Sequence, residues 1–123
     1  MSAPHYPGRA PIEAYGNGGF RFAGMSHRGS ILCLPSGVMA WSVMSAASLT
    51  EDSLSAVLAE CDAIGFLLLG MGRSVGVLPA GLRKMFVEAK VGLEPMDTGA
   101  ACRTYNVLLA EGRPVAAALI AVD

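Results

Sequence analysis

Short runs of hydrophobic residues, separated by turn residues, fill the first forty-odd positions of the chain. The letters IEAY and FRFAG flank the turn GNGG, and Asn17-Gly18 is typical of a tight hairpin. The letters SILCL and VMAWSV flank a second turn, PSG. We therefore predict N-terminal hairpins that form a small antiparallel β layer. Residues 1–11 contain three prolines and are predicted to be a flexible leader.

The hydrophobic spacing widens after residue 49 to that of helices alternating with strands. Residues 64–69 read IGFLLL, which is typical of a strand covered on both faces. The alternation predicts one α/β domain over residues 12–123, with three layers and a central mixed, mostly parallel sheet. The expected elements are helices over residues 50–61, 82–89 and 97–111, and strands over residues 64–69, 93–96 and 115–122.

Composition argues against nucleic-acid binding, secretion, membrane insertion and a structural zinc site. The 123 residues fit one domain, and a formal net charge of −1 provides no basic field for nucleic acid. The N-terminal letters lack the apolar core of a signal peptide, and no apolar run approaches the ~20 residues of a membrane helix. The three cysteines are far apart and no CxxC pair occurs, so neither a zinc site nor a disulfide framework is expected. These features predict a soluble, cytoplasmic protein without membrane insertion.

The tripeptide Asp97-Thr98-Gly99 matches the signature of aspartic proteases. That chemistry needs two carboxylates sharing a proton, whereas this chain holds one copy of the motif, at the start of a predicted helix. Asp97 is a good N-cap residue, because its side chain can accept hydrogen bonds from amides of the first helical turn. We therefore interpret the motif as a helix cap.

A glycine-rich loop follows the buried strand and includes Gly70, Gly72 and Arg73. It approaches the dinucleotide fingerprint, but its third glycine comes one position late and Pro79 interrupts the following segment. The phosphate-binding Gly-Lys-Ser/Thr motif is absent. We predict a tight turn without a cofactor, although Arg73 keeps an anion site open.

Ligands of open parallel sheets bind beyond the carboxyl ends of the strands. There the loops after residues 64–69 and 93–96 should bring Gly70, Gly72 and Arg73 close to Asp97 and Thr98. No histidine, activated cysteine or carboxylate pair has catalytic spacing there, so no catalytic residue is predicted.

Polar residues of the third helix are further candidates. Arg103 and Asn106 lie on one flank of the apolar stripe, and Asn106 is expected to face the crevice. Glu111 lies in the last turn, where the helix dipole disfavours a carboxylate, so it should pair with Arg113 or Arg103. This cluster is interpreted either as a salt bridge that holds the helix end or as a polar group facing a groove.

The segment from Met96 to Arg113, with the letters MDTxxACRTYNxLxxEGR, resembles a family of domains of unknown function. That family includes the mitochondrial respiratory complex I assembly factor 3 and many small bacterial proteins. The resemblance extends from Ile12 to Ile120 and includes Tyr15, Gly24 and Pro79. It implies a compact three-layer α/β domain, a bacterial, cytoplasmic member and no established enzyme activity.

Two functions of different classes remain. The first is a non-catalytic scaffold that helps assemble a respiratory or other membrane complex by holding a protein partner at an apolar surface with a polar rim. The second is binding of, or minor enzyme activity on, a small anionic ligand in the crevice. An open pocket with converging amides would favour the ligand, whereas a crevice plugged by Met71 or Tyr105 would favour the scaffold. The sequence leaves open whether the chain forms a homo-oligomer.

Overall fold

The computed structural model describes residues 6–123, which fold into strands and helices in nearly regular alternation after residue 64. The strands are β1 Ile12–Gly16, β2 Gly19–Phe22, β3 Met25–Arg28, β4 Ser30–Leu34, β5 Gly37–Trp41, β6 Phe66–Gly70, β7 Gly92–Met96 and β8 Val115–Leu119. The helices are α1 Ser55–Leu58, α2 Leu82–Glu88 and α3 Thr98–Ala110, and three short 3-10 turns are η1 Ala46–Ser48, η2 Asp52–Leu54 and η3 Cys61–Ala63.

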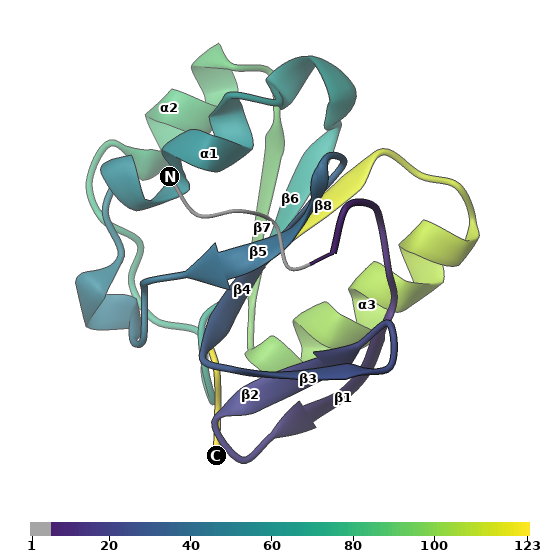
Figure 1. Ribbon diagram of the computed structural model, residues 1–123. Coiled ribbons are helices and arrows are strands. Elements are labelled where there is room, and N and C mark those ends of the chain that lie inside the picture. The colour runs from purple at the N-terminus through teal and green to yellow at the C-terminus, as the bar shows by residue number, and fades with distance from the viewer. Residues whose placement is uncertain (1–5) are drawn as a thin grey trace.

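Two sheets organise these elements, which confirms the predicted α/β class (Figure 1). The small sheet has the order β1-β2-β3 and is antiparallel throughout. The central sheet has the order β5-β4-β8-β6-β7. In it β6 pairs in parallel with β7 and β8, whereas β4 pairs antiparallel with β5 and β8. The central sheet is therefore mixed, with parallel and antiparallel pairings in equal number.

The second predicted hairpin is placed differently from the expectation. Strands β4 and β5 belong to the central sheet, not to the small N-terminal layer. All five residues of β4 are buried, because α3 and the small sheet cover one of its faces and the α1–α2 side covers the other. The small sheet is completed instead by β3, which the hydrophobic pattern did not indicate. It follows a tight turn in which Ala23 and Gly24 have φ of 50° and 74°.

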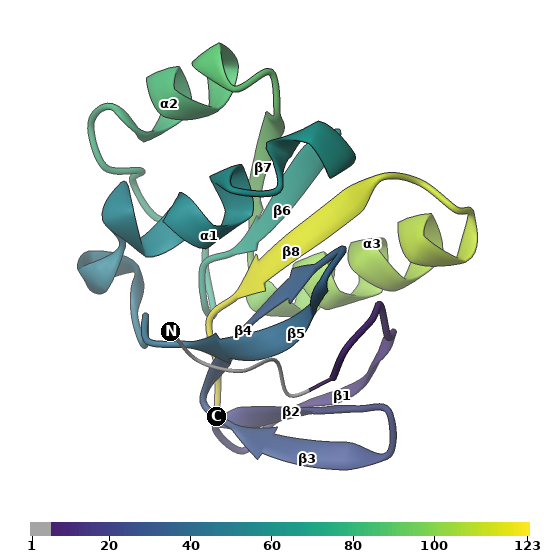
Figure 2. The ribbon, with the colours of Figure 1, turned by 45° about the horizontal axis from the view of Figure 1, so that its top comes forward.

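The central sheet is the middle of three layers. Helices α1 and α2 lie on one face, and α3 and the small sheet lie on the other, as Figure 2 shows. Alternate residues of β6 point to opposite faces, so Leu67 and Leu69 join the cluster under α2 whereas Leu68 packs under α3. The continuous apolar run of this strand thus fills both cores.

The observed helices agree to different degrees with the helices that the hydrophobic spacing predicted. Helix α3 begins and ends close to the predicted positions, whereas the helix expected over residues 50–61 is divided into η2, α1 and η3. Thr50 caps the entry to this segment, because its Oγ1 accepts a hydrogen bond from Ser53 N–H (3.1 Å). Within the described part of the chain, no helix is both long and apolar enough to cross a membrane.

Only part of the predicted leader can be placed. Residues 1–5 lie outside the described residues. From residue 6 onward the chain lies against the domain, because Tyr6 and Val38 exchange two backbone hydrogen bonds of 3.2 and 2.9 Å. Ala10 is also buried in the core beneath the small sheet.

Candidate functional site

The connections of β6 define a switch point in the central sheet. The chain leaves β6 through α2 to reach β7 on one side, and then returns through α3 to β8 on the other side. The two helices lie on opposite faces, so the connections that leave the carboxyl ends of β6 and β7 diverge. A crevice at such a point is the usual ligand position in α/β sheets.

A hollow of about 390 Å³ lies next to this point, beyond the carboxyl ends of β6 and β8, and we call it the switch-point hollow. Met71, Gly72 and Arg73 line it after β6, and residues 120–123 line it after β8. Residues 44–46, after β5, close another side. The hollow therefore lies beyond the ends of β6 and β8, whereas the crevice was expected beyond the ends of β6 and β7.

Thr98 joins the segments behind the hollow. Its buried Oγ1 donates to Ile120 C=O (2.7 Å) and accepts from Gly72 N–H (3.0 Å). Thr98 N–H in turn donates to Gly72 C=O (2.8 Å). A Cβ built on Gly70 would lie 3.1 Å from Thr98 Cα, so glycine permits this close approach. Gly70, Gly72 and Thr98 thus hold the two strand ends and the helix start together.

Asp97 occupies the N-cap of α3, as predicted. Its Oδ1 accepts a hydrogen bond from Ala100 N–H (2.8 Å). The glycine of the tripeptide has a separate structural reason, because a Cβ at Gly99 would lie 2.5 Å from the Tyr15 hydroxyl of β1. These local contacts account for every residue of the protease-like tripeptide.

Arg73 differs from the other candidates in having no partner among the described residues. It is exposed, lines the switch-point hollow and forms no hydrogen bond or ion pair with any of the residues 6–123. The amides beside it are already used, since Gly72 N–H donates to Thr98 and Met71 N–H donates to Met96 C=O (2.8 Å). A cradle of converging amides is therefore not formed by these two residues.

Asn106 and Arg103 serve a different part of the molecule. The Asn106 side chain accepts from Ile12 N–H (2.7 Å) and donates to Ile12 C=O (2.8 Å), as a neighbouring strand would. Arg103 Nη1 donates to the Tyr15 hydroxyl at 3.4 Å. Both residues attach β1 to α3, so neither is among the residues that line the hollow. The pairing with Ile12 lies 94 positions apart in sequence, and local spacing could not indicate it.

Glu111 and Arg113 lie between the end of α3 and the start of β8, away from the carboxyl ends of the strands. Their closest side-chain atoms are 3.9 Å apart, and both side chains are about half exposed. Arg113 also lies over the Phe66 ring, 5.8 Å from its centroid. The predicted ion pair is present, but an exposed pair of this kind contributes under about 1 kcal/mol.

The buried titratable groups beneath α3 are not poised for chemistry. Burial raises the pKa of Cys102 to about 12, with a further rise from Asp97 and an opposing effect of Arg103. Burial also raises the pKa of Cys33 and of Tyr105 well above their ordinary values. A thiolate nucleophile is thus disfavoured at both cysteines. Among residues 6–123, no three His, Cys, Asp or Glu side chains are grouped closely enough to bind a metal.

Exposed apolar side chains lie at the switch-point hollow and on the loop beside it, and the hydrophobic pattern did not indicate them. Met44, Val75 and Val77 are 58%, 53% and 93% exposed, and we call them the apolar rim. Met44 lines the hollow itself. The loop that carries both valines packs against it, because a Cβ on Gly76 would lie 3.7 Å from Met71 Cε. A hydrophobic pattern alone cannot separate an exposed valine from a buried one.

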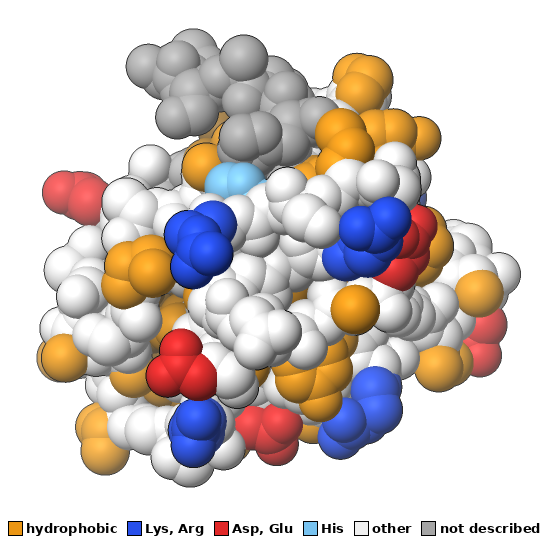
Figure 3. Space-filling view, turned by 60° about the horizontal axis from the view of Figure 1, so that its bottom comes forward, with side chains coloured by type: hydrophobic (Ala, Val, Ile, Leu, Met, Phe, Trp, Pro, Cys, Tyr) orange, Lys and Arg blue, Asp and Glu red, His pale blue; other side chains and the backbone are white. Residues whose placement is uncertain are grey.

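Basic side chains do not gather into one field on the face that Figure 3 shows. Lys and Arg side chains are interspersed there with Asp and Glu. This arrangement gives no continuous track for a phosphate backbone.

The comparisons place the chain among known proteins. Residues 12–120 match the family described as protein of unknown function (DUF498/DUF598). A crystal structure described as an outer membrane protein from Bartonella henselae is 54% identical, with a TM-score of 0.93, and the match covers 97% of this chain and 100% of that one. An uncharacterized protein of Rhodobacter capsulatus is 42% identical over 95% of this chain and 89% of its own length.

A more distant relative carries a functional name. NADH dehydrogenase [ubiquinone] 1 alpha subcomplex assembly factor 3 of Xenopus tropicalis is 34% identical over 89% of this chain. The match spans 60% of that protein's length.

Proposed function

The chain belongs to the family described as protein of unknown function (DUF498/DUF598), and we propose that it is a non-catalytic interaction protein. In this proposal residues 12–123 act as one domain in the bacterial cytoplasm. The domain assists assembly of a membrane protein complex by holding one of its subunits before the complex is complete.

The apolar rim is the observation that carries this proposal. Three large apolar side chains at one end of a mixed sheet expose surface that a partner could bury. Arg73 lies in the same part of the chain and has no partner within residues 6–123, and a polar group next to an apolar centre is the usual composition of a protein interface. The name of the Xenopus relative supports a role in assembly.

Binding of a small anionic ligand is the second candidate. Arg73, which lines the switch-point hollow and is unpaired in the part of the chain that the structure describes, favours it. Three features weigh against it: Gly72 and Met71 have already donated their N–H groups, and the buried Met71 forms part of the wall. We therefore rank ligand binding second to the interaction role.

Affinity capture tests the interaction role. Tagged chain is crosslinked in Rhodobacter capsulatus cells from which the native relative has been deleted, and membranes are solubilised in detergent before mass spectrometry. We expect enrichment of subunits of a membrane complex, and a several-fold loss of that enrichment for the double variant Val75→Asp/Val77→Asp, because carboxylates resist burial in an apolar interface.

The matched control is Val87→Asp. Val87 is 74% exposed and apolar but lies on α2, outside the apolar rim. Equal capture by the parent chain and the rim variant would contradict a partner surface at this position. Retention of phosphate-containing metabolites by the parent chain, lost in Arg73→Ala, would instead favour the ligand-binding candidate.

A further inference from the structure

Exposed sheet edges carry unpaired backbone N–H and C=O groups, and folded proteins usually block them. Two of the outer strands in the described residues are each blocked at one residue by hydrogen bonds. At β5, Tyr6 pairs with Val38 through both of its backbone groups. At β1, the side-chain amide of Asn106 satisfies both backbone groups of Ile12.

The edge at β7 is blocked by proline. Gly92 N–H donates to Gly65 C=O, and Met96 C=O accepts from Met71 N–H, so these residues turn their backbone groups toward β6. Because successive residues of a strand direct their backbone groups to opposite sides, Leu93 and Pro95 direct their backbone groups away from β6. Pro95 has no N–H to offer to another strand.

Within residues 6–123, the edge at β3 has no such block. Gly29 N–H donates to Gly18 C=O (2.7 Å), and Gly16 pairs with Gly19 across the β1–β2 hairpin. Successive residues of a strand direct their backbone groups to opposite sides. Because Gly29 faces β2, the backbone groups of Ser26 and Arg28 face away from β2. No residue among 6–123 pairs with that side of β3, and Figure 2 shows the strand at the outer border of the small sheet.

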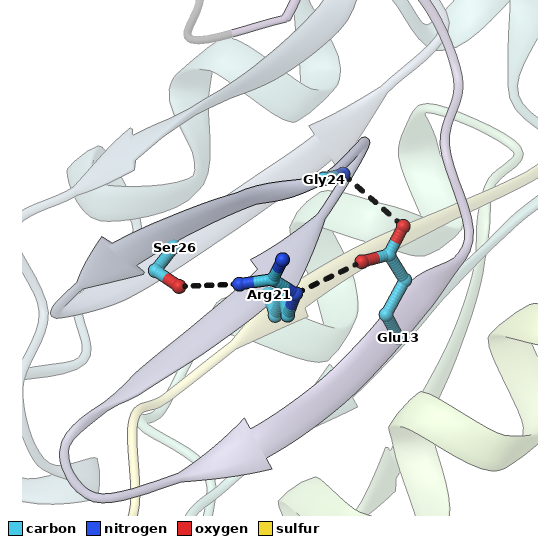
Figure 4. A network of polar contacts seen from close by, with 4 residues as sticks. All are labelled: Glu13, Arg21, Gly24 and Ser26. Carbon is cyan, nitrogen blue, oxygen red and sulfur yellow. Dashed lines mark hydrogen bonds and ion pairs between the residues drawn. The ribbon is translucent and has the colours of Figure 1, made fainter.

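The two arginines near this edge differ in whether a carboxylate neutralises their charge. Arg21 is neutralised by Glu13 (3.4 Å) and donates to the Ser26 hydroxyl (3.1 Å), while a second oxygen of Glu13 accepts from Gly24 N–H (Figure 4). Arg28 forms no side-chain hydrogen bond or ion pair with the described residues. It borders a shallow hollow of about 480 Å³ on the outer face of the small sheet.

We propose that the open edge of β3 binds an extended acidic segment of a partner protein, which adds as a fourth strand of the small sheet. Backbone groups of Ser26 and Arg28 would pair with the added strand, as in other cases of β-augmentation. A carboxylate on the outer face of that strand would lie beside Arg28 and pair with it.

The charge of Arg28 selects this occupant over a second copy of the chain. An outward arginine on an edge opposes pairing with another strand of the same charge. It favours a strand that carries carboxylates at alternate positions. The proposal goes beyond the proposed function, because the lining of the outer hollow does not include the apolar rim.

A synthetic peptide tests the proposal directly. The probe is an eight-residue peptide of alternating valine and glutamate with blocked ends, titrated into the isotopically labelled full chain and followed by NMR. We expect the amide signals of Ser26 and Arg28 to shift most and their exchange with solvent to slow. The matched peptide with lysine in place of glutamate should bind at least about fivefold more weakly.

Two variants separate the backbone contact from the charge. Ser26→Pro removes an outward N–H without removing a hydrogen bond to β2, and should abolish binding. Arg28→Glu should weaken binding of the glutamate peptide by roughly tenfold and strengthen that of the lysine peptide. Arg83→Glu, an exposed change of the same charge on α2, should alter neither.

Three outcomes would overturn the proposal. One is equal binding of the two peptides by the parent chain. Another is a set of shifts centred on the apolar rim instead of on β3. The third is sedimentation as a dimer in which the amides of Ser26 and Arg28 are already protected without peptide, since a second copy would then occupy the edge. The capture experiment depends on Val75 and Val77, so each proposal can fail without the other.

Discussion

Asp97 shows at the scale of one residue how a motif can resemble a catalytic site while serving the fold. Its carboxylate accepts from Ala100 N–H and thereby satisfies one of the unpaired amides at the start of α3. The neighbouring residues also serve the fold, since Thr98 bonds to Ile120 and Gly99 leaves room for Tyr15. The arrangement needs no second copy of the motif.

The substitution Asp97→Ala should lower the free energy of unfolding by about 1 kcal/mol, because the helix loses its cap. Urea unfolding followed by circular dichroism measures this change. Asp97→Asn retains an accepting oxygen and should remain close to the parent chain. An Asp97→Ala chain as stable as the parent, yet inactive in capture, would contradict a role limited to the cap.

The buried thiols predict a dependence of stability on pH. An unfolded cysteine ionises near its ordinary pKa of 9.0, whereas burial raises the pKa of Cys102 in the fold to about 12. The unfolded chain therefore releases a proton first, and the free energy of unfolding should fall as pH rises from about 9 toward 12. Cys102→Ala should reduce this slope in urea unfolding across that range, and an unchanged slope would contradict the assignment.

Elements differ in how well the sequence alone foretold them. Helix α3 was predictable because its cap, its apolar stripe and the glycine after its end are all local signals. The place of the second hairpin was not, because pairing of β4 with β8 joins residues 31–33 to residues 117–119. Gly72 and Arg73 line a hollow, whereas Asn106 lies against β1, because its partner Ile12 is 94 positions away and local patterns cannot indicate that contact.

The contacts of Asn106 predict how strongly the attachment of β1 to α3 stabilises the fold. Its two hydrogen bonds to Ile12 attach β1 to α3, so Asn106→Ala should leave both backbone groups of Ile12 without their partner. We expect a loss of roughly 1–3 kcal/mol in unfolding free energy and faster hydrogen exchange at Ile12. Arg103→Ala removes only a 3.4 Å contact to Tyr15 near the surface and should cost much less. Equal effects of the two changes would contradict this ranking.

At the scale of the whole molecule, a well-packed framework carries two surfaces, the apolar rim and the β3 edge, that have no partner in the described residues. Buried side chains fill both faces of the central sheet, and Thr98 fixes the strand ends behind the switch-point hollow. The apolar rim and the β3 edge stand outside this framework. A domain that must hold an unfinished subunit needs such surfaces on a stable support.

The most direct test of the assembly role measures complexes in the membrane. In a Rhodobacter capsulatus strain that lacks its own relative, native gels should show loss or incomplete assembly of a membrane complex. The parent chain and Val87→Asp should restore it, whereas Val75→Asp/Val77→Asp should not, although circular dichroism shows it folded. Intact complexes in the deletion strain, or full restoration by the rim variant, would contradict the account.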